Sequence, residues 1–138
     1  DDATTATAVA IGKELKKTMV IVKDSPAFVV NRLLTRFMGE ITDAIDEGTP
    51  YNVADAAMQP LGLPMSSLQL LGLVGPAIAL HVAETLNQSL GERYKISPTM
   101  QAFVSQGVKS FYIKDSDGKS YRMNGNMLYT DLNDEEDD

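Results

Sequence analysis

The chain has 138 residues, of which 43% are hydrophobic and 22% charged, a balance typical of one globular domain with a core of ordinary size. It contains no cysteine, which excludes a disulfide framework, a thiolate zinc site and a cysteine nucleophile. No apolar run reaches the roughly 20 residues that span a bilayer, and the first residues do not resemble a signal peptide. We therefore expect a cytoplasmic protein without a membrane partner.

The formal net charge of −7 is concentrated at the C-terminus. The last residues, DLNDEEDD, hold six acids and no base, which leaves the rest of the chain with a net charge of −1. No basic stripe is present, so we expect no nucleic-acid partner. We expect residues 126–138 to be a disordered, solubilising tail rather than a binding tail.

The N-terminal residues predict one helix followed at once by one strand. Apolar residues at 8, 11 and 15 indicate a helix of about three turns within residues 5–17, and TMVIVKD predicts a strand at residues 18–24. This pair is half of a βαβ unit, with no sheet to join in this sequence. We therefore expect residues 1–24 to be the end of a larger α/β domain.

Four or five packed helices are predicted next. Ser25 and Pro26 predict the start of the longest helix, about 20 residues long, which ends at Gly48. A short helix follows from Asn52, with Asp55 as its first-turn acid. Further helical segments are expected at 66–75, 76–93 and 98–106, the first of them buried in the core or in a subunit interface.

The C-terminal region returns to an alternation of period two. SFYIKDSDGKSYRM, residues 110–123, alternates around a DSDG turn and predicts a β-hairpin.

No complete catalytic constellation is visible in the sequence. His81, the single histidine, lies in mid-helix with Glu84 three residues on, a pair that could ligate a metal or transfer protons. Because no second histidine, cysteine or acid cluster accompanies it, we interpret it as a partly buried helix histidine and predict no metal site. A glycine-rich phosphate loop is also absent, since LGLPM and LGLVG lack the G-x-G-x-x-G order.

Asn31 is the polar residue that composition does not explain. In KDSPAFVVNRLL it follows four residues that prefer burial, and a buried amide without a partner costs about 1–3 kcal/mol. The residues alone leave a local hydrogen bond and a ligand contact equally open. Met65 has two interpretations: core packing, which is favoured, and the lining of an apolar acyl channel. Arg32 is expected to be a surface or interface charge.

Three segments resemble the C-terminal domain of the 3-hydroxyacyl-CoA dehydrogenases, including the fatty-acid-oxidation α subunits: VIVKDSPAFVVNRLLTRFMGEITDAIDEGTP, VADAAMQPLGLPMSSLQLLGLVG and HVAETL. The resemblance covers roughly residues 5–112. It implies a mainly α fold, a helical 6-phosphogluconate-dehydrogenase-C-terminal-like domain at 25–125. One helix and strand left over from a Rossmann domain would precede it at 1–24, and a small C-terminal β-hairpin would close it.

The resemblance also implies a function. The family oxidises a 3-hydroxyacyl-CoA to the 3-ketoacyl-CoA with NAD, using a histidine base, a glutamate that orients it, and a serine and an asparagine that bond the substrate oxygen. The asparagine falls on Asn31, which would be catalytic and substrate-binding. Met65 would bind the acyl-CoA substrate, and Lys109 matches a lysine near the cofactor. His81 does not match the family base.

The remaining site groups and most of the NAD contacts would belong to a domain outside this chain. By the resemblance, the chain alone is therefore expected to be inactive. We also expect it to form a homodimer or to pack against another copy of the domain.

The sequence departs from the family pattern after GLPM. The family tends to have G-P-F-E-L-L-D where this chain has SSLQLLG, so Gln69 and Gly72 replace two carboxylates and Ser67 replaces a proline. Ala27 stands where the family usually has glycine, a change compatible with a helix. The altered segment favours a second hypothesis, a non-catalytic structural half-domain of a multifunctional β-oxidation protein, whereas the retained Asn31 argues against it. A third is an oligomerisation module from the wider hydroxyacid dehydrogenase group.

Overall fold

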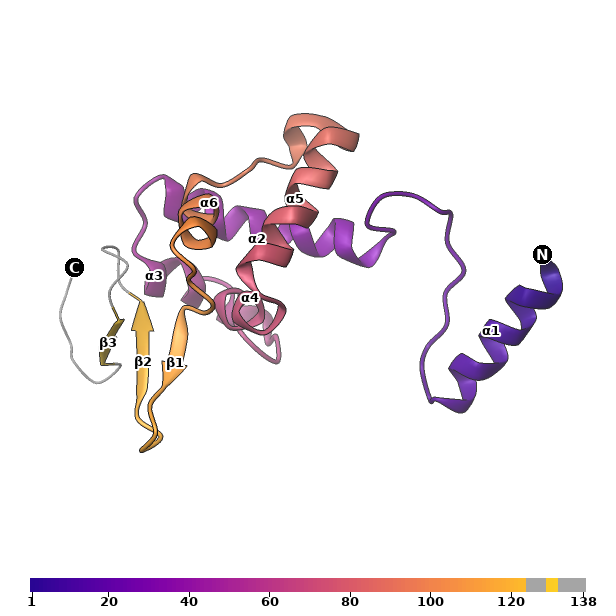
Figure 1. The fold of residues 1–138 in the computed structure, drawn as a ribbon, viewed down its shortest axis with the longest axis horizontal. Coiled ribbons are helices and arrows are strands. Elements are labelled where there is room, and N and C mark those ends of the chain that lie inside the picture. Colours follow the sequence, from indigo (N-terminus) through magenta and orange to yellow (C-terminus); the bar gives the residue numbers. More distant parts are fainter. Residues whose placement is uncertain (124–128, 132–138) are drawn as a thin grey trace.

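The computed structural model describes residues 1–123 and 129–131. Figure 1 shows helix α1 apart from the rest of the chain, at the end of an extended segment, while α2 to α6 pack together and carry a small sheet. The helices are α1 (Asp2–Glu14), α2 (Val30–Asp46), α3 (Tyr51–Ala56), α4 (Ser67–Val74), α5 (Pro76–Leu90) and α6 (Pro98–Ser105), with 3₁₀ turns η1 (Gln59–Leu61) and η2 (Gly91–Arg93). The strands are β1 (Tyr112–Lys114), β2 (Ser120–Met123) and β3 (Tyr129–Asp131). The mainly helical fold predicted from the sequence is confirmed.

No strand forms at residues 18–24 in the described part of the chain, which offers this segment no sheet to join, so the strand stays a prediction. This segment is extended but pairs with no other strand in the described part of the chain, and Val20 and Ile21 are 72% and 73% exposed. β-branched residues favour an extended backbone, but a strand also needs a partner, and the sheet of the described residues consists of β1, β2 and β3. At its start the segment contacts α1, since Met19 Sδ occupies the space that a Cβ on Gly12 would need.

Helix α2 begins at Val30, later than the Ser–Pro pair predicts. Residues 26–29 form a turn in which Ala27 and Phe28 have φ values of 58° and 52°. Two successive residues in the left-handed region cannot belong to a right-handed helix, so Ala27 is not the helical residue that we expected. The Ser25 hydroxyl does not cap the helix but accepts a hydrogen bond from Arg32 Nη2 at 2.6 Å.

Other helix ends follow their local signals. Gly48 and Gly91, with φ of 99° and 77°, lie just beyond the ends of α2 and α5. Ser97 Oγ accepts from Met100 N at 3.2 Å and caps α6. At the start of α4, Ser66 and Gln69 form a capping box with reciprocal bonds of 3.2 and 3.0 Å. These ends were predictable because the residues that make them are neighbours in sequence.

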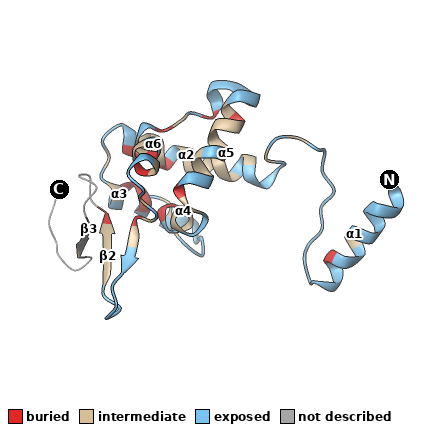
Figure 2. Cartoon of the chain, viewed as in Figure 1, coloured by how far each residue is buried: buried red, intermediate tan, exposed pale blue. Residues whose placement is uncertain are grey.

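The core lies among α2, α3, α4, α6 and the start of the sheet. Phe103 and Phe111 are 0% and 1% exposed and meet edge to face with centroids 4.5 Å apart. Buried residues gather around this pair, whereas α1 is almost wholly exposed (Figure 2). The other core side chains are Ile41, Ile45, Ala54, Leu68, Leu71, Met100 and Met123. The predicted burial of segment 66–75 is thus confirmed on one face of α4, while Leu73 on the other is 73% exposed.

The predicted hairpin is present as β1 and β2, which pair antiparallel with Ile113 opposite Tyr121. A third strand was not predicted. β3 pairs with β2 and places Asp131, which we had assigned to the acidic tail, in an ion pair with Lys119. Residues 124–128 and 132–138 lie outside the described residues, so the expected disorder of the tail is not tested.

Helices α4 and α5 meet at a sharp bend. In the described ranges, no single helix is both long and apolar enough to cross a bilayer. Segments Ser67–Val74 and Pro76–Arg93 reach the required length and hydropathy only when taken together, and they are bent by 98°.

Candidate functional site

Asn31 lies in the first turn of α2 and is exposed. It lines a groove of about 200 Å³ that runs between α2, α5 and residues 93–97. The first turn of a helix has backbone N–H groups without intrahelical partners, so polar groups of a ligand can approach it favourably. The Asn31 amide is therefore placed where it could meet a ligand.

Apolar side chains make up most of the groove. They come from three helices: Leu34 and Met38 of α2, Val74 of α4, and Ile78, Leu80 and Val82 of α5. Such a lining fits a ligand that is mainly apolar, with a few polar groups to fix its orientation.

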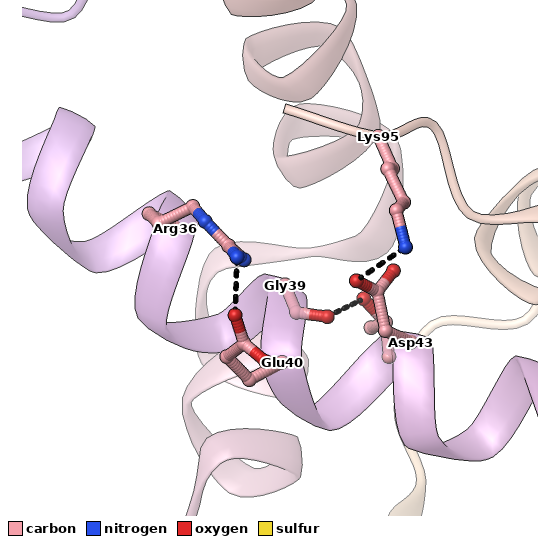
Figure 3. Close-up of polar contacts among 6 residues, drawn as sticks. Arg36, Gly39, Glu40, Asp43 and Lys95 are labelled. Carbon is pink, nitrogen blue, oxygen red and sulfur yellow. Dashed lines mark hydrogen bonds and ion pairs between the residues drawn. The ribbon is translucent and has the colours of Figure 1, made fainter. Parts of the chain in front are cut away.

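Polar residues also line the groove, and Figure 3 shows the contacts that some of them make. Lys95 Nζ lies 3.2 Å from Asp43 Oδ2, and Arg36 pairs with Glu40 one turn away on α2. The Thr42 hydroxyl donates to the carbonyl of Gly39 at 3.1 Å. Exposed ion pairs contribute roughly 0–1 kcal/mol. The Lys95 pair nevertheless connects α2 with the segment between α5 and α6, and so joins two walls of the groove.

Arg32, the neighbour of Asn31, is half-buried and bonded within the chain, so its description as a surface or interface charge was incomplete. Its Nε donates to the carbonyl of Pro26 at 2.8 Å and its Nη2 to Ser25 Oγ at 2.6 Å. On the other side, Tyr94 Oη donates to the carbonyl of Arg32 at 3.2 Å. These contacts fix the start of α2 from two directions.

Met65 lies in a different place. It lines a second cavity of about 290 Å³, formed by the 58–66 segment with Gln69 and Tyr112. The two cavities share no lining residue. The structure therefore does not bring the two predicted substrate-binding residues, Asn31 and Met65, together in one cavity.

The second cavity contains a buried carboxylate that the sequence analysis assigned only as a first-turn acid. Asp55 is 3% exposed, and its Oδ1 accepts from Leu68 N at 2.8 Å while its Oδ2 accepts from Tyr112 Oη at 2.6 Å. Burial, and then the hydrogen bond to Asp55, raise the pKa of Tyr112 well above its usual value. Asp55 of α3 thus accepts hydrogen bonds from the backbone at the start of α4 and from Tyr112 of β1. These two donors lie 13 and 57 positions after Asp55 in the sequence.

The other residues singled out in the sequence lie apart from both cavities. Lys109 is exposed in the segment between α6 and β1. His81 is exposed on α5, so the expectation of partial burial is wrong: the side of α5 that carries it faces solvent. Within residues 1–123 and 129–131, no cluster of three histidine, cysteine or acidic side chains could hold a metal ion.

Comparison with known proteins decides the family. The model of the family described as "3-hydroxyacyl-CoA dehydrogenase, C-terminal domain" matches residues 28–111, which is more than half of the chain. The chain belongs to this family. The resemblance seen in the sequence is thereby confirmed. The match includes Asn31, Arg32, Met65 and Lys109.

Relatives of this dehydrogenase domain are much longer than the chain. It is 33% identical over 129 residues to the fatty acid oxidation complex subunit alpha of Vibrio parahaemolyticus, covering 94% of the chain and 17% of the relative. The subunit of the same name from Idiomarina loihiensis is 32% identical over 108 residues, covering 78% and 15%. The chain thus spans about a sixth of the length of these relatives.

Solved structures resemble the domain closely. The (S)-3-hydroxybutyryl-CoA dehydrogenase PaaH1 from Ralstonia eutropha matches with a TM-score of 0.71 and 31% identity, covering 78% of this chain and 39% of that one. FadB2 of M. tuberculosis matches with the same TM-score and coverage at 28% identity. The dehydrogenase domain is therefore recognisable in both sequence and backbone.

Proposed function

We propose that the chain is the substrate-binding and dimerisation domain of an NAD-dependent 3-hydroxyacyl-CoA dehydrogenase that acts in fatty-acid β-oxidation. The observation that carries the proposal is Asn31, an exposed amide at the start of α2, at the edge of a largely apolar groove and inside the segment that the family model matches. An amide N–H can donate to the substrate oxygen as it changes from hydroxyl to carbonyl. Asn31 would hold this oxygen in position.

The described residues do not form a nucleotide site by themselves. They contain no glycine-rich phosphate loop between a strand and a helix, and Lys109 is an isolated exposed cation with no such loop beside it. In this proposal NAD is bound by another domain, which also supplies the histidine, glutamate and serine of the site. The chain alone is then inactive and contributes one hydrogen-bond donor, part of the substrate cleft and a docking surface.

Exposed apolar side chains support the dimerisation part of the proposal. Leu73, Val74 and Ile78 of α4 and α5 are 73%, 42% and 60% exposed. Val74 and Ile78 also line the groove, so the proposed partner surface borders the substrate cleft, and Leu73 is the part of it that lies outside both cavities. Apolar residues gathered on neighbouring elements often mark a surface that another protein chain covers. A second copy of the domain is the proposed partner.

Replacing Asn31 tests the proposed role. In the complete dehydrogenase, Asn31→Ala should lower kcat/KM for reduction of acetoacetyl-CoA. The expected loss of transition-state stabilisation is about 2–3 kcal/mol, by analogy with the loss of an oxyanion-hole donor. The matched control is Asn52→Ala, because Asn52 is exposed on α3 and lines neither cavity. Full turnover by the Asn31 variant would show that the proposed role is wrong.

A non-catalytic structural half-domain is the second candidate, and the residues that replace the family pattern after GLPM favour it. Gln69 caps α4 together with Ser66, and Gly72 leaves room for Ser110, whose Oγ would lie 2.4 Å from a Cβ on Gly72. Both replacements thus serve folding in this chain. If this candidate is right, Asn31→Ala leaves the activity unchanged, while substitutions in the exposed apolar surface separate the domain from its partner.

A further inference from the structure

We propose that Arg32 is a positioning residue for Asn31: its guanidinium holds the turn that precedes α2, and thereby fixes where the Asn31 amide points. The inference rests on the proposed function of Asn31 as a substrate-binding residue. It extends that function to a residue that neither contacts the groove nor was expected to act in it.

Residues 26–29 form the turn that precedes α2. Ala27 and Phe28 both have left-handed φ, a conformation that costs energy for residues with a side chain. Packing does little to hold it, since Phe28, Val29 and Val30 are 54%, 50% and 72% exposed. Something other than burial must keep these residues in place.

The guanidinium of Arg32 bonds two residues at the start of this turn. The Arg32 side chain reaches back across it and donates to the carbonyl of Pro26 at 2.8 Å and to Ser25 Oγ at 2.6 Å. The two donors, Nε and Nη2, belong to one planar guanidinium and meet two acceptors from adjacent residues. A lysine ammonium is a point charge without this fork geometry and could reproduce the arrangement only in part.

The backbone of Arg32 is bonded to the body of the domain. Tyr94, which is 8% exposed, donates from Oη to the carbonyl of Arg32 at 3.2 Å. The carbonyl of Tyr94 in turn accepts from Asn87 Nδ2 of α5 at 2.8 Å. The backbone at residue 32 is thus tied to α5, while its side chain is tied to the turn. Asn31 is the adjacent residue, so its direction depends on both ties.

A double-substitution cycle in the complete dehydrogenase tests the inference. Arg32→Ala should lower kcat for acetoacetyl-CoA about 10- to 100-fold, the cost expected when a reacting group is misplaced by about 1 Å. Arg32→Lys should lower kcat less than Arg32→Ala does. Ser25→Ala should lower kcat least of the three, because it leaves the bond from Arg32 to the Pro26 carbonyl in place. The control is Ser105→Ala, a remote hydroxyl that bonds the Ala102 carbonyl of its own helix.

The decisive readout is the same substitution in the Asn31→Ala background. If Arg32 acts through Asn31, Arg32→Ala should cause no further loss there. An equal loss in both backgrounds would overturn the inference, since a purely structural effect does not depend on Asn31. If Arg32→Ala does not fold, Arg32→Lys and Ser25→Ala carry the same cycle.

A second measurement separates this inference from the function on which it rests. Hydrogen exchange in the 138-residue chain should show faster exchange at residues 26–33 in Arg32→Ala, with α6 unchanged. Unchanged exchange at 26–33 would contradict the inference alone. If Asn31→Ala instead leaves the turnover of acetoacetyl-CoA unchanged, the proposed function is wrong, and with it the positioning role.

Discussion

At the scale of single residues, the side chains that hold this domain together have partners far away in sequence. Asp55 bonds Leu68 N and Tyr112 Oη at 2.8 and 2.6 Å, and Arg32 accepts at its carbonyl from a tyrosine 62 positions away. The sequence pattern placed Asp55 in a first helical turn and Arg32 at the surface or an interface because it reports only local neighbours. It could point to Asn31 as unusual, since an amide beside an apolar run is itself a local feature.

The Asp55–Tyr112 bond makes a prediction about stability. Tyr112→Phe leaves a buried carboxylate with one fewer donor, so it should lower the free energy of unfolding by about 1–2 kcal/mol at pH 7. Urea unfolding of the 138-residue chain measures this. Tyr121→Phe is the control, because the Tyr121 hydroxyl bonds Asp115 in an exposed part of the hairpin.

The burial of Tyr112, together with its bond to Asp55, predicts a dependence on pH. The pKa of Tyr112 is raised in the folded state, so the protonated phenol is favoured there and its stabilisation is complete below the unfolded pKa of 10.0. Stability should therefore fall as the pH rises above 10, and fall less in Tyr112→Phe. Identical pH profiles for the two proteins would contradict the assignment.

At the scale of elements, most helix ends and the hairpin of β1 and β2 were predictable, whereas the third strand and the start of α2 were not. Gly48, Gly91 and Ser97 end or begin helices through neighbours within four positions, so the sequence is sufficient there. The strand β3 was missed because residues 129–131 were assigned to the acidic tail, although they pair with the preceding strand β2. The strand expected at 18–24 has no partner among the described residues and stays a prediction. The start of α2 was misjudged for a third reason: the Ser–Pro signal is overridden by the Arg32 contacts that hold a left-handed turn.

This turn makes a prediction of its own. Ala27→Gly should raise the free energy of unfolding by about 0.5–1 kcal/mol, because glycine adopts φ of 58° without a clash of its side chain. Ala77→Gly, at an exposed position in α5, should lower it by a similar amount. Chemical unfolding of both variants checks the pair, and equal destabilisation by both would show that residue 27 is not left-handed.

At the scale of the whole molecule, the chain is one helical body with a detached N-terminal helix, and its family was recognisable from the motif around Asn31 and G-L-P-M. The sequence could not show that Asn31 and Met65 line separate cavities, because this depends on how α2 and the 58–66 segment pack. Within this account, the site is completed by groups outside the chain, and Asn31 is the part that this domain contributes.

The most direct test is a crystal structure of the complete dehydrogenase with acetoacetyl-CoA bound. The account predicts Asn31 Nδ2 within about 2.7–3.2 Å of the oxygen on C3 of the substrate, with Arg32 still bonded to Pro26 and Ser25. A substrate oxygen held entirely by other residues, with the Asn31 amide facing solvent or another polypeptide, would contradict it.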